Sequence, residues 1–501
     1  MNYKNGIKSM LFGILQQALT LAIGLIAPRL FLLTFGSETN GVLNTIANIF
    51  SYLALVEAGV GTAALQAFYE TIGRNDREGT NGVISAVHAY FKKAGLVYFA
   101  GVMLLAVIYP LSIDTSLSYW TIFWLVILSG MGGVINFWCQ AKYKLYLQAE
   151  GKNYILSILT MVVYFATNIS KIAMIMLGYD VVAIHVVYFA INIVQMLFVE
   201  WYIKRFYPWL NIHAKPRIEA ISQKTAILVQ QITWIICSNT DILVLTYVGK
   251  DLKSVSVYGV YLMIFSMLDN LFRNLFGSFH YLLGQKYNSD RENYMPYHEA
   301  YESVSMAVSF GLYTTAYLLM TPFLNIYARG ITDARYVDPY LPLLFTVMHL
   351  LSSGREASSR VINFERHFKQ MQWRAILESV INIVVSIILV KKVGIYGVLI
   401  GTIIAYLYRT NDIILYAAKH ILKRTCMVTY KRWIVNVLIF IVAVMINYRV
   451  DLNSVSFIMF FIKAIPVCIV TCVTYLGAIF IYDNTAAKRV WIIFSKKLFK
   501  R

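Results

Sequence analysis

Charge is scarce in this sequence. Asp, Glu, Lys and Arg make up 14% of its 501 residues, whereas a typical soluble domain carries about 25%. Hydrophobic residues make up 59% of the chain, and its mean hydropathy is +0.62. So little charge in so long a chain excludes one large water-soluble core and indicates several membrane-spanning helices.

Long polar segments are absent as well. No predicted loop exceeds about 25 residues, and neither a GxxxxGK[ST] phosphate-binding motif nor an HExxH zinc motif occurs. The five cysteines fall almost entirely in apolar segments, without His or carboxylate groups at metal-ligand spacing, and we interpret them as small packing residues. We therefore expect no enzyme activity, no cofactor and no nucleic-acid partner, but a function within the bilayer.

Apolar segments long enough to cross the hydrocarbon core, about 20 residues each, occur fourteen times. They are 10–34, 42–69, 94–112, 119–140, 154–178, 181–203, 225–248, 255–284, 303–326, 338–362, 375–393, 395–418, 432–448 and 455–482. Only helices and closed barrels satisfy the backbone in lipid, and these segments are too long for barrel strands. The sequence therefore predicts an all-α polytopic membrane protein.

The basic residues predict the orientation of these spans. Of the 44 Lys and Arg, a cytoplasmic N-terminus places 30 on the cytoplasmic side and seven opposite. Basic residues concentrate in cytoplasmic loops, so we expect both termini in the cytoplasm. The tail KRVWIIFSKKLFKR (488–501) predicts a basic amphipathic helix in contact with membrane lipids.

A weak internal repeat divides the chain. The matches are Asp76-Arg77-Glu78 with Asp290-Arg291-Glu292 at an offset of 214, and Gly61 with Gly277 and Gly178 with Gly394 at an offset of 216. Six spans separate the copies, so the repeat predicts two parallel-related six-helix lobes around a central cavity, an architecture typical of transporters. The predicted parts are an N-lobe (1–203), a cytoplasmic linker (204–224), a C-lobe (225–420), and two accessory helices with the tail (421–501).

Three short stretches carry a family resemblance: FGSETNGVLNTI (35–46), LVEAGVGTA (55–63) and TDILVLTYVG (240–249). In this order, and with fourteen spans in two lobes, they resemble the Wzx-type polysaccharide and O-antigen flippases. These belong to the multidrug/oligosaccharidyl-lipid/polysaccharide exporter (MOP) superfamily. The resemblance implies a substrate, an undecaprenyl-pyrophosphate-linked oligosaccharide such as an O-antigen or capsule unit, moved to the outer leaflet by alternating access. It also implies polysaccharide assembly enzymes as partners.

Two other functions stay open. One is a cation-coupled multidrug exporter of the same superfamily, although such exporters usually have twelve spans and acidic cavities. The other is a membrane-embedded polysaccharide polymerase or ligase, although such enzymes need a sizeable outer loop. The sequence does not distinguish Na⁺, H⁺ and the membrane potential as the driving force.

Four basic residues inside the spans are candidates for binding the anionic pyrophosphate: Arg29, Lys171, Arg273 and Arg355. Ionisable groups at this depth normally face an interior or a wet cavity, and arginine donates several hydrogen bonds to phosphate. Each residue also has an alternative role. The alternatives are an Arg29 that reaches the outer headgroups, a Lys171 that packs between the lobes, an Arg355 that lies in a loop within SSGREASSR, and an Arg273 that pairs with Asp269 one turn before it.

Three acidic residues inside the spans are candidates for gating or ion coupling: Glu57, Asp241 and Asp269. The offset of 216 makes Glu57 and Arg273 equivalent. We therefore expect them to pair across the lobes in one state and to separate when the substrate phosphate binds the arginine. The alternatives are a protonated Glu57 in ordinary helix packing, and an Asp241 that either binds a cation or proton or pairs with a neighbouring helix.

Overall fold

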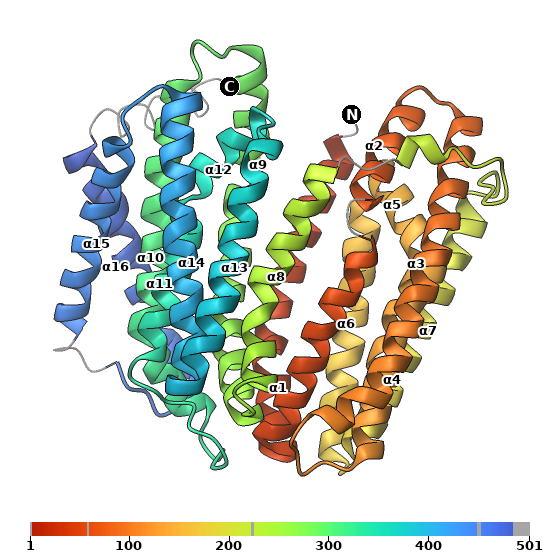
Figure 1. Cartoon of the computed structure of the whole chain (residues 1–501), viewed down its shortest axis with the longest axis horizontal. Coiled ribbons are helices and arrows are strands. Elements are labelled where there is room, and N and C mark those ends of the chain that lie inside the picture. The colour runs from red at the N-terminus through yellow and green to blue at the C-terminus, as the bar shows by residue number, and fades with distance from the viewer. Residues whose placement is uncertain (1–2, 58–59, 222–224, 448–451, 484–501) are drawn as a thin grey trace. The chain divides into compact units, whose positions relative to one another are not determined.

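The computed structural model describes residues 3–57, 60–221, 225–447 and 452–483. Throughout these ranges every regular element is a helix (Figure 1). The prediction of an all-α protein is therefore confirmed. The predicted amphipathic tail, 488–501, lies outside the described residues.

The chain forms two compact units, Met1–Ser256 and Val257–Arg501. The first contains α1 (Tyr3–Leu53), η1 (Ala54–Glu57), α2 (Val60–Gly73), α3 (Arg77–Ser112), α4 (Tyr119–Ile135), η2 (Asn136–Gln140), α5 (Ala141–Ala149), α6 (Asn153–Met176), α7 (Val181–Phe206), η3 (Ile218–Ile221), α8 (Thr225–Tyr247) and the start of α9 (Leu252–Ser289). The second contains the rest of α9, α10 (Met295–Tyr327), α11 (Leu341–Gly354), α12 (Glu356–Phe364), α13 (Phe368–Val393), α14 (Ile395–Tyr416), η4 (Ala417–Leu422), α15 (Met427–Asn447) and α16 (Phe457–Tyr482).

Many of these helices can cross a membrane. In the described chain, ten are long and apolar enough to do so, and the bent pair Ile23–Glu57 and Val60–Gly73 makes an eleventh. Each of the fourteen predicted segments overlaps one helix or up to three consecutive helices. Some helices extend past their predicted ends because hydropathy detects only the apolar part of a helix; α3, for example, begins at Arg77. The chain is a multi-pass membrane protein.

The boundary between the units lies after α8, whereas the sequence placed 225–248 in the second lobe. Polar contacts explain why α8 packs in the first unit. The Thr45 and Thr246 hydroxyls lie 2.8 Å apart, and those of Tyr52 and Thr240 lie 3.0 Å apart. Hydroxyls buried on facing helices satisfy one another, and hydropathy alone does not show which helix is the partner.

Helix α1 contains the first predicted span and the start of the second. Gly36 interrupts it with φ 78° and ψ 171°, a conformation that is essentially restricted to glycine. The ribbon turns back on itself at this point (Figure 1). A first segment (3–35) and a second segment (37–53) of α1 therefore form a helical hairpin.

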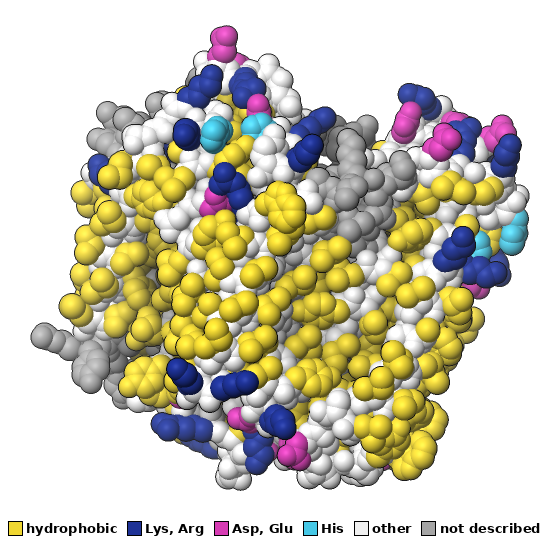
Figure 2. Space-filling model, in the orientation of Figure 1, with side chains coloured by type: hydrophobic (Ala, Val, Ile, Leu, Met, Phe, Trp, Pro, Cys, Tyr) yellow, Lys and Arg dark blue, Asp and Glu magenta, His cyan; other side chains and the backbone are white. Residues whose placement is uncertain are grey.

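Helix α13 has a polar inner face and an apolar outer face. Glu378, Ser379 and Asn382 are buried, whereas Leu377, Val380, Val384 and Ile388 are exposed at helical spacing. A soluble protein places these residue types the other way round. On the face in Figure 2, hydrophobic side chains likewise cover the middle of the helices, and most charged side chains gather near their ends. This distribution matches a lipid-facing surface.

The predicted linker is anchored to the first unit. The Asn81 side chain at the start of α3 donates to the Trp209 carbonyl (3.3 Å) and accepts from the Asn211 amide (2.9 Å). Further along the linker, the Arg217 amide donates to the Gly82 carbonyl, 3.0 Å away. These bonds hold the segment after α7 against the N-terminal end of α3.

Candidate functional site

A cavity of about 340 Å³ lies among α1, α4, α6 and α7 in the first unit. Its walls are partly apolar, with Ile46 and Phe50 contributed by the second segment of α1. Its polar lining includes Ser129, Thr167, Asn168, Lys171, His185 and Tyr188. Hydroxyl, amide, imidazole and ammonium groups thus meet inside the membrane-spanning part of the unit.

Lys171 supplies the positive charge of this cavity. Its Nζ lies 4.1 Å from the centroid of the Phe31 ring, in a cation–π contact. No acidic side chain of the described residues forms an ion pair with it. The Thr167 hydroxyl, also on the cavity, is buried and has no hydrogen bond to a described residue. Without a counter-charge, and with polar groups around it, Lys171 can hold an anion.

The other predicted residues of the first unit lie on different elements. Arg29 is half-buried in the first segment of α1, and Asp241 is buried on α8, where it interacts electrostatically with Tyr52. Glu57 ends η1, half-buried, and interacts electrostatically with Lys144 of α5. Lys144 was missed because the sequence places it in a loop.

The predicted pairing of Glu57 with Arg273 joins residues of different units and stays a prediction. Each of the two residues has its own interaction within its unit. Lys144 is the electrostatic partner of Glu57, and Asn270 accepts a hydrogen bond from Arg273. Neither interaction requires the other unit.

In the second unit, Asp269 of α9 is held by side chains of two neighbouring helices. The Tyr313 hydroxyl of α10 donates to its carboxylate, and Nδ1 of His349 on α11 lies 3.1 Å from it. Arg273, one turn along α9, is exposed and donates to Asn270 Oδ1 at 3.2 Å. The two residues interact electrostatically, but the ion pair that the sequence left open does not form. The Arg273 guanidinium is therefore accessible to a ligand.

Arg355 belongs to a buried ion network across the break between α11 and α12. It donates to Glu378 at 2.9 Å, and Arg409 lies 3.3 Å from the same carboxylate and 3.0 Å from Asp412. Arg374 completes the network by pairing with Asp412. The SSGREASSR patch is thus helical on both sides of Arg355 and not a long loop. Because Glu378 compensates Arg355, this arginine offers less charge to a ligand than Lys171 or Arg273.

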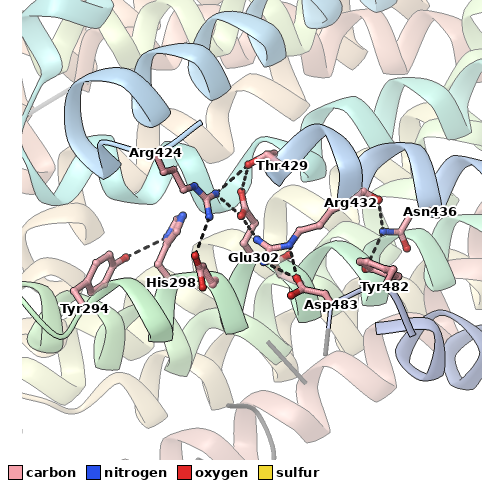
Figure 3. Close-up of polar contacts among 11 residues, drawn as sticks. Tyr294, His298, Glu302, Arg424, Thr429, Arg432, Asn436, Tyr482 and Asp483 are labelled. Carbon is pink, nitrogen blue, oxygen red and sulfur yellow. Dashed lines mark hydrogen bonds and ion pairs between the residues drawn. The ribbon is translucent and has the colours of Figure 1, made fainter. Parts of the chain in front are cut away.

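A second ion network joins α10 to α15 and α16 (Figure 3). Glu302, 2% exposed, accepts hydrogen bonds from Arg424, Arg432 and the Thr429 hydroxyl. Arg432 also donates to Asp483 at the end of α16, 2.8 Å away. The sequence alone did not predict this cluster because its members fall at the ends of predicted spans. The sequence does contain a signal for this cluster. The acidic residues before the span 303–326 and the basic residues before the span 432–448 are predicted to lie on the same side of the membrane.

The described residues contain no group of three or more His, Cys, Asp or Glu that could hold a metal ion.

Outside the spans, the Glu365 carboxylate after α12 accepts hydrogen bonds from Tyr287 and Arg291, which lower its pKa. Glu365 is therefore a fixed negative charge outside the spans. Lys171 and Arg273 lie in the described spans without an ion pair to a described residue, and both are suited to an anionic ligand.

No protein-family model matches the chain, and no curated protein sequence matches it either. Solved structures do. The lipid II flippase MurJ in an inward-closed conformation has a TM-score of 0.67 at 16% identity, over 95% of this chain and 99% of that one. The chain has the fold of a MOP-superfamily transporter. An inward-facing multidrug resistance MATE family transporter of the MOP superfamily has a TM-score of 0.62 at 14% identity, over 82% and 96% of the two chains. An outward-facing multidrug resistance MATE family transporter of the MOP superfamily has a TM-score of 0.58 at 14% identity, over 84% of this chain and 96% of that one.

The two kinds of MOP-superfamily structure differ in how much of this chain they cover. The multidrug structures leave 18% and 16% of it unmatched. The segment 421–501, which contains α15 and α16, is 81 of 501 residues, or 16%. The flippase structure leaves only 5% unmatched. The length that the multidrug structures leave unmatched is thus about that of the whole segment 421–501.

Proposed function

We propose that this protein is a flippase that moves a lipid-linked anionic oligosaccharide from the inner to the outer leaflet of the bacterial cytoplasmic membrane. The substrate we propose is an undecaprenyl-pyrophosphate-linked repeat unit of an O-antigen, capsule or related polymer. The observation that carries the proposal is Lys171, a cation without a described acidic partner, in a polar cavity inside the spans. The shared fold with a lipid II flippase supports it.

Charge explains why an anion is the better candidate than a cationic drug. A cation in a low-dielectric site interacts strongly with a phosphate because little water screens the pair. Lys171 lines a cavity and Arg273 is exposed, and neither forms an ion pair with a described residue, whereas Asp269 is held by Tyr313 and His349. A site for cationic drugs needs the opposite arrangement, with an accessible carboxylate.

In the proposed cycle, Lys171 of the first unit binds the pyrophosphate, and the hydroxyl and amide groups beside it orient the phosphate groups. Arg273, in the second unit, offers its guanidinium to the pyrophosphate at a separate place in the chain. The prenyl chain stays in the lipid, so only the charged and sugar-bearing part needs a polar path. The chemistry involves no covalent step, so binding and a change between inward- and outward-open states suffice. Polysaccharide assembly enzymes are the partners we expect on both sides of the membrane.

The test is flipping by the purified protein in liposomes. Undecaprenyl-pyrophosphate bearing a fluorescent oligosaccharide is placed in both leaflets, and a membrane-impermeant quencher reports its redistribution. We expect Lys171→Ala and Arg273→Ala each to slow flipping about 10- to 100-fold, since a hydrogen bond to a charged group contributes about 1.5–3 kcal/mol. Lys171→Arg keeps the charge and retains more activity than Lys171→Ala.

The matched control is Lys463→Ala. Lys463 is also a span lysine, but its Nζ donates to the Asn453 carbonyl, 2.6 Å away. Flipping at the wild-type rate by Lys171→Ala would remove this cavity from the mechanism. Uptake of a cationic dye by the wild-type liposomes, with no movement of the lipid-linked sugar, would instead support the multidrug exporter.

A further inference from the structure

His349 on α11 is a buried histidine that lies beside both an aromatic ring and a carboxylate. It is 6% exposed, and its ring stacks on Phe265 at a centroid distance of 4.8 Å and an interplanar angle of 16°. Its Nδ1 lies 3.1 Å from the Asp269 carboxylate. Its Nε2 is buried and has no hydrogen bond to a described residue. The ring is therefore fixed by one nitrogen and leaves the other available.

This arrangement has two protonation states that the same geometry accommodates. A neutral imidazole donates its Nδ1 proton to Asp269 and leaves a lone pair on Nε2. A second proton on Nε2 makes an imidazolium, which the adjacent carboxylate stabilises. The Tyr313 hydroxyl donates to the same carboxylate and keeps it in place.

Arg273 connects this pair to ligand binding. It lies one turn along α9 from Asp269 and interacts with it electrostatically, but its hydrogen bond goes to Asn270. When His349 is neutral, the charge of Asp269 opposes that of Arg273. When His349 is protonated, the histidine compensates Asp269 and leaves the full charge of Arg273 for an anion.

We propose that Asp269 and His349 form a proton-binding site whose occupancy raises the affinity of Arg273 for the anionic substrate. The proposal rests on the proposed function, in which Arg273 binds the pyrophosphate. By linkage, an anion at Arg273 raises the affinity of the pair for a proton by the same factor. One proton then accompanies the anion and lowers the net charge of the complex inside the low-dielectric part of the protein.

Other titratable groups reach α10 and α11 from the helices packed on them, but each is bonded in a cluster of its own. They are Arg432 on α15, Tyr475, Cys468 and Cys472 on α16, Glu356 and Arg360 on α12, and Arg409 and Asp412 on α14. Within the described residues, the interactions that act on Asp269 come from His349, Tyr313 and Arg273. The proton site is thus electrostatically simple.

The experiment measures binding of farnesyl pyrophosphate to the full-length protein in nanodiscs over a series of pH values. The probe itself also titrates, so the informative quantity is the difference in pH slope between wild type and His349→Gln. We expect the wild-type affinity to fall as pH rises, relative to the variant, by up to roughly tenfold per pH unit for one linked proton. His420→Gln, on an exposed histidine at the end of the same unit's η4, serves as the control and keeps the wild-type slope.

Two further variants show that the probe reports on this site. Asp269→Asn removes the opposing charge, and we expect it to bind the probe at high pH at least as tightly as wild type, with a slope like that of His349→Gln. Arg273→Ala loses binding at every pH. Equal slopes in wild type and His349→Gln overturn the proposal, and so does wild-type binding that is absent or independent of Arg273.

Failure of the proposed function gives a different result. If the wild type binds the probe with a His349-dependent slope but does not flip the lipid-linked oligosaccharide, the proton site stands and the flippase assignment falls. If the oligosaccharide is flipped in an Arg273-dependent way while the slopes are equal, the flippase assignment stands and the proton site falls.

Discussion

At the scale of single residues, charge compensation separates two kinds of buried ion. Glu302 and Glu378 each bind two guanidinium groups of neighbouring helices, so they hold helices together. Lys171 has a ring beneath it and polar groups around it, without a described acid. Removal of a residue of the first kind affects stability, whereas removal of one of the second kind affects ligand binding.

Glu302→Gln tests the first kind. The substitution keeps the size of the side chain but leaves Arg424 and Arg432 without their shared carboxylate. Breaking a buried pair by removing one partner typically costs about 3–5 kcal/mol, so we expect a loss of this order in the free energy of unfolding in detergent. Chemical denaturation of the purified protein measures it.

Glu299→Gln is the matched control, one turn earlier on α10. Glu299 lies 3.8 Å from Arg424 and is more exposed than Glu302. An exposed or partly exposed pair contributes about 1 kcal/mol or less. Equal losses in the two variants would contradict the role of Glu302 as the shared acceptor.

At the scale of the helices, one close approach depends on the absence of a side chain. A Cβ on Gly41, in the second segment of α1, would lie 2.0 Å from the carbonyl oxygen of Leu252 at the start of α9. Beside this contact, Asn40 donates to the Ser256 hydroxyl at 2.8 Å. These two residues are 216 positions apart, the offset at which the repeat makes positions equivalent. Gly41 thus sets the distance between two backbone segments.

Gly41→Ala should therefore separate α1 from Leu252. Because Cβ atoms essentially never come within 3.0 Å of another heavy atom, the backbone must move by at least 1 Å. With the five native cysteines replaced, Asn40→Cys and Ser256→Cys can be joined by a short thiol crosslinker, and we expect a lower yield in the Gly41→Ala background. Gly61→Ala, where a Cβ would meet nothing within 4 Å, should leave the yield unchanged. An unchanged yield with Gly41→Ala would show that the contact is loose.

At the scale of the whole molecule, the sequence predicts helix content well because long apolar runs have few alternatives in lipid. It predicts partners of buried ions poorly. The pair Arg409 and Asp412 is an exception, because residues three apart on one helix lie on the same face. The contacts of Asp269 with Tyr313 and His349 join three helices, and periodicity contains no information on which helices face one another.

Orientation in the membrane is the whole-molecule prediction that a direct experiment can decide. The excess of basic residues in alternate loops predicts that the loop before α3 is cytoplasmic and the loop after it is external. Helix α3 has 36 residues, or about 54 Å at 1.5 Å per residue, enough to cross the bilayer with its headgroup regions. Arg74 and Asp114 are exposed on either side of it.

In a background without the native cysteines, we expect a membrane-impermeant maleimide to label Asp114→Cys in intact spheroplasts. Arg74→Cys should be labelled only after the membrane is opened. In the second unit, we expect Asp333→Cys, after α10, to be labelled in intact spheroplasts like Asp114→Cys. We expect Glu292→Cys, before α10, to be labelled only after the membrane is opened, like Arg74→Cys. The parallel repeat requires the two units to give the same pattern, because six spans separate equivalent loops. Opposite patterns in the two units would contradict the repeat, and a reversed pattern in both would keep the repeat but invert the proposed direction of transport.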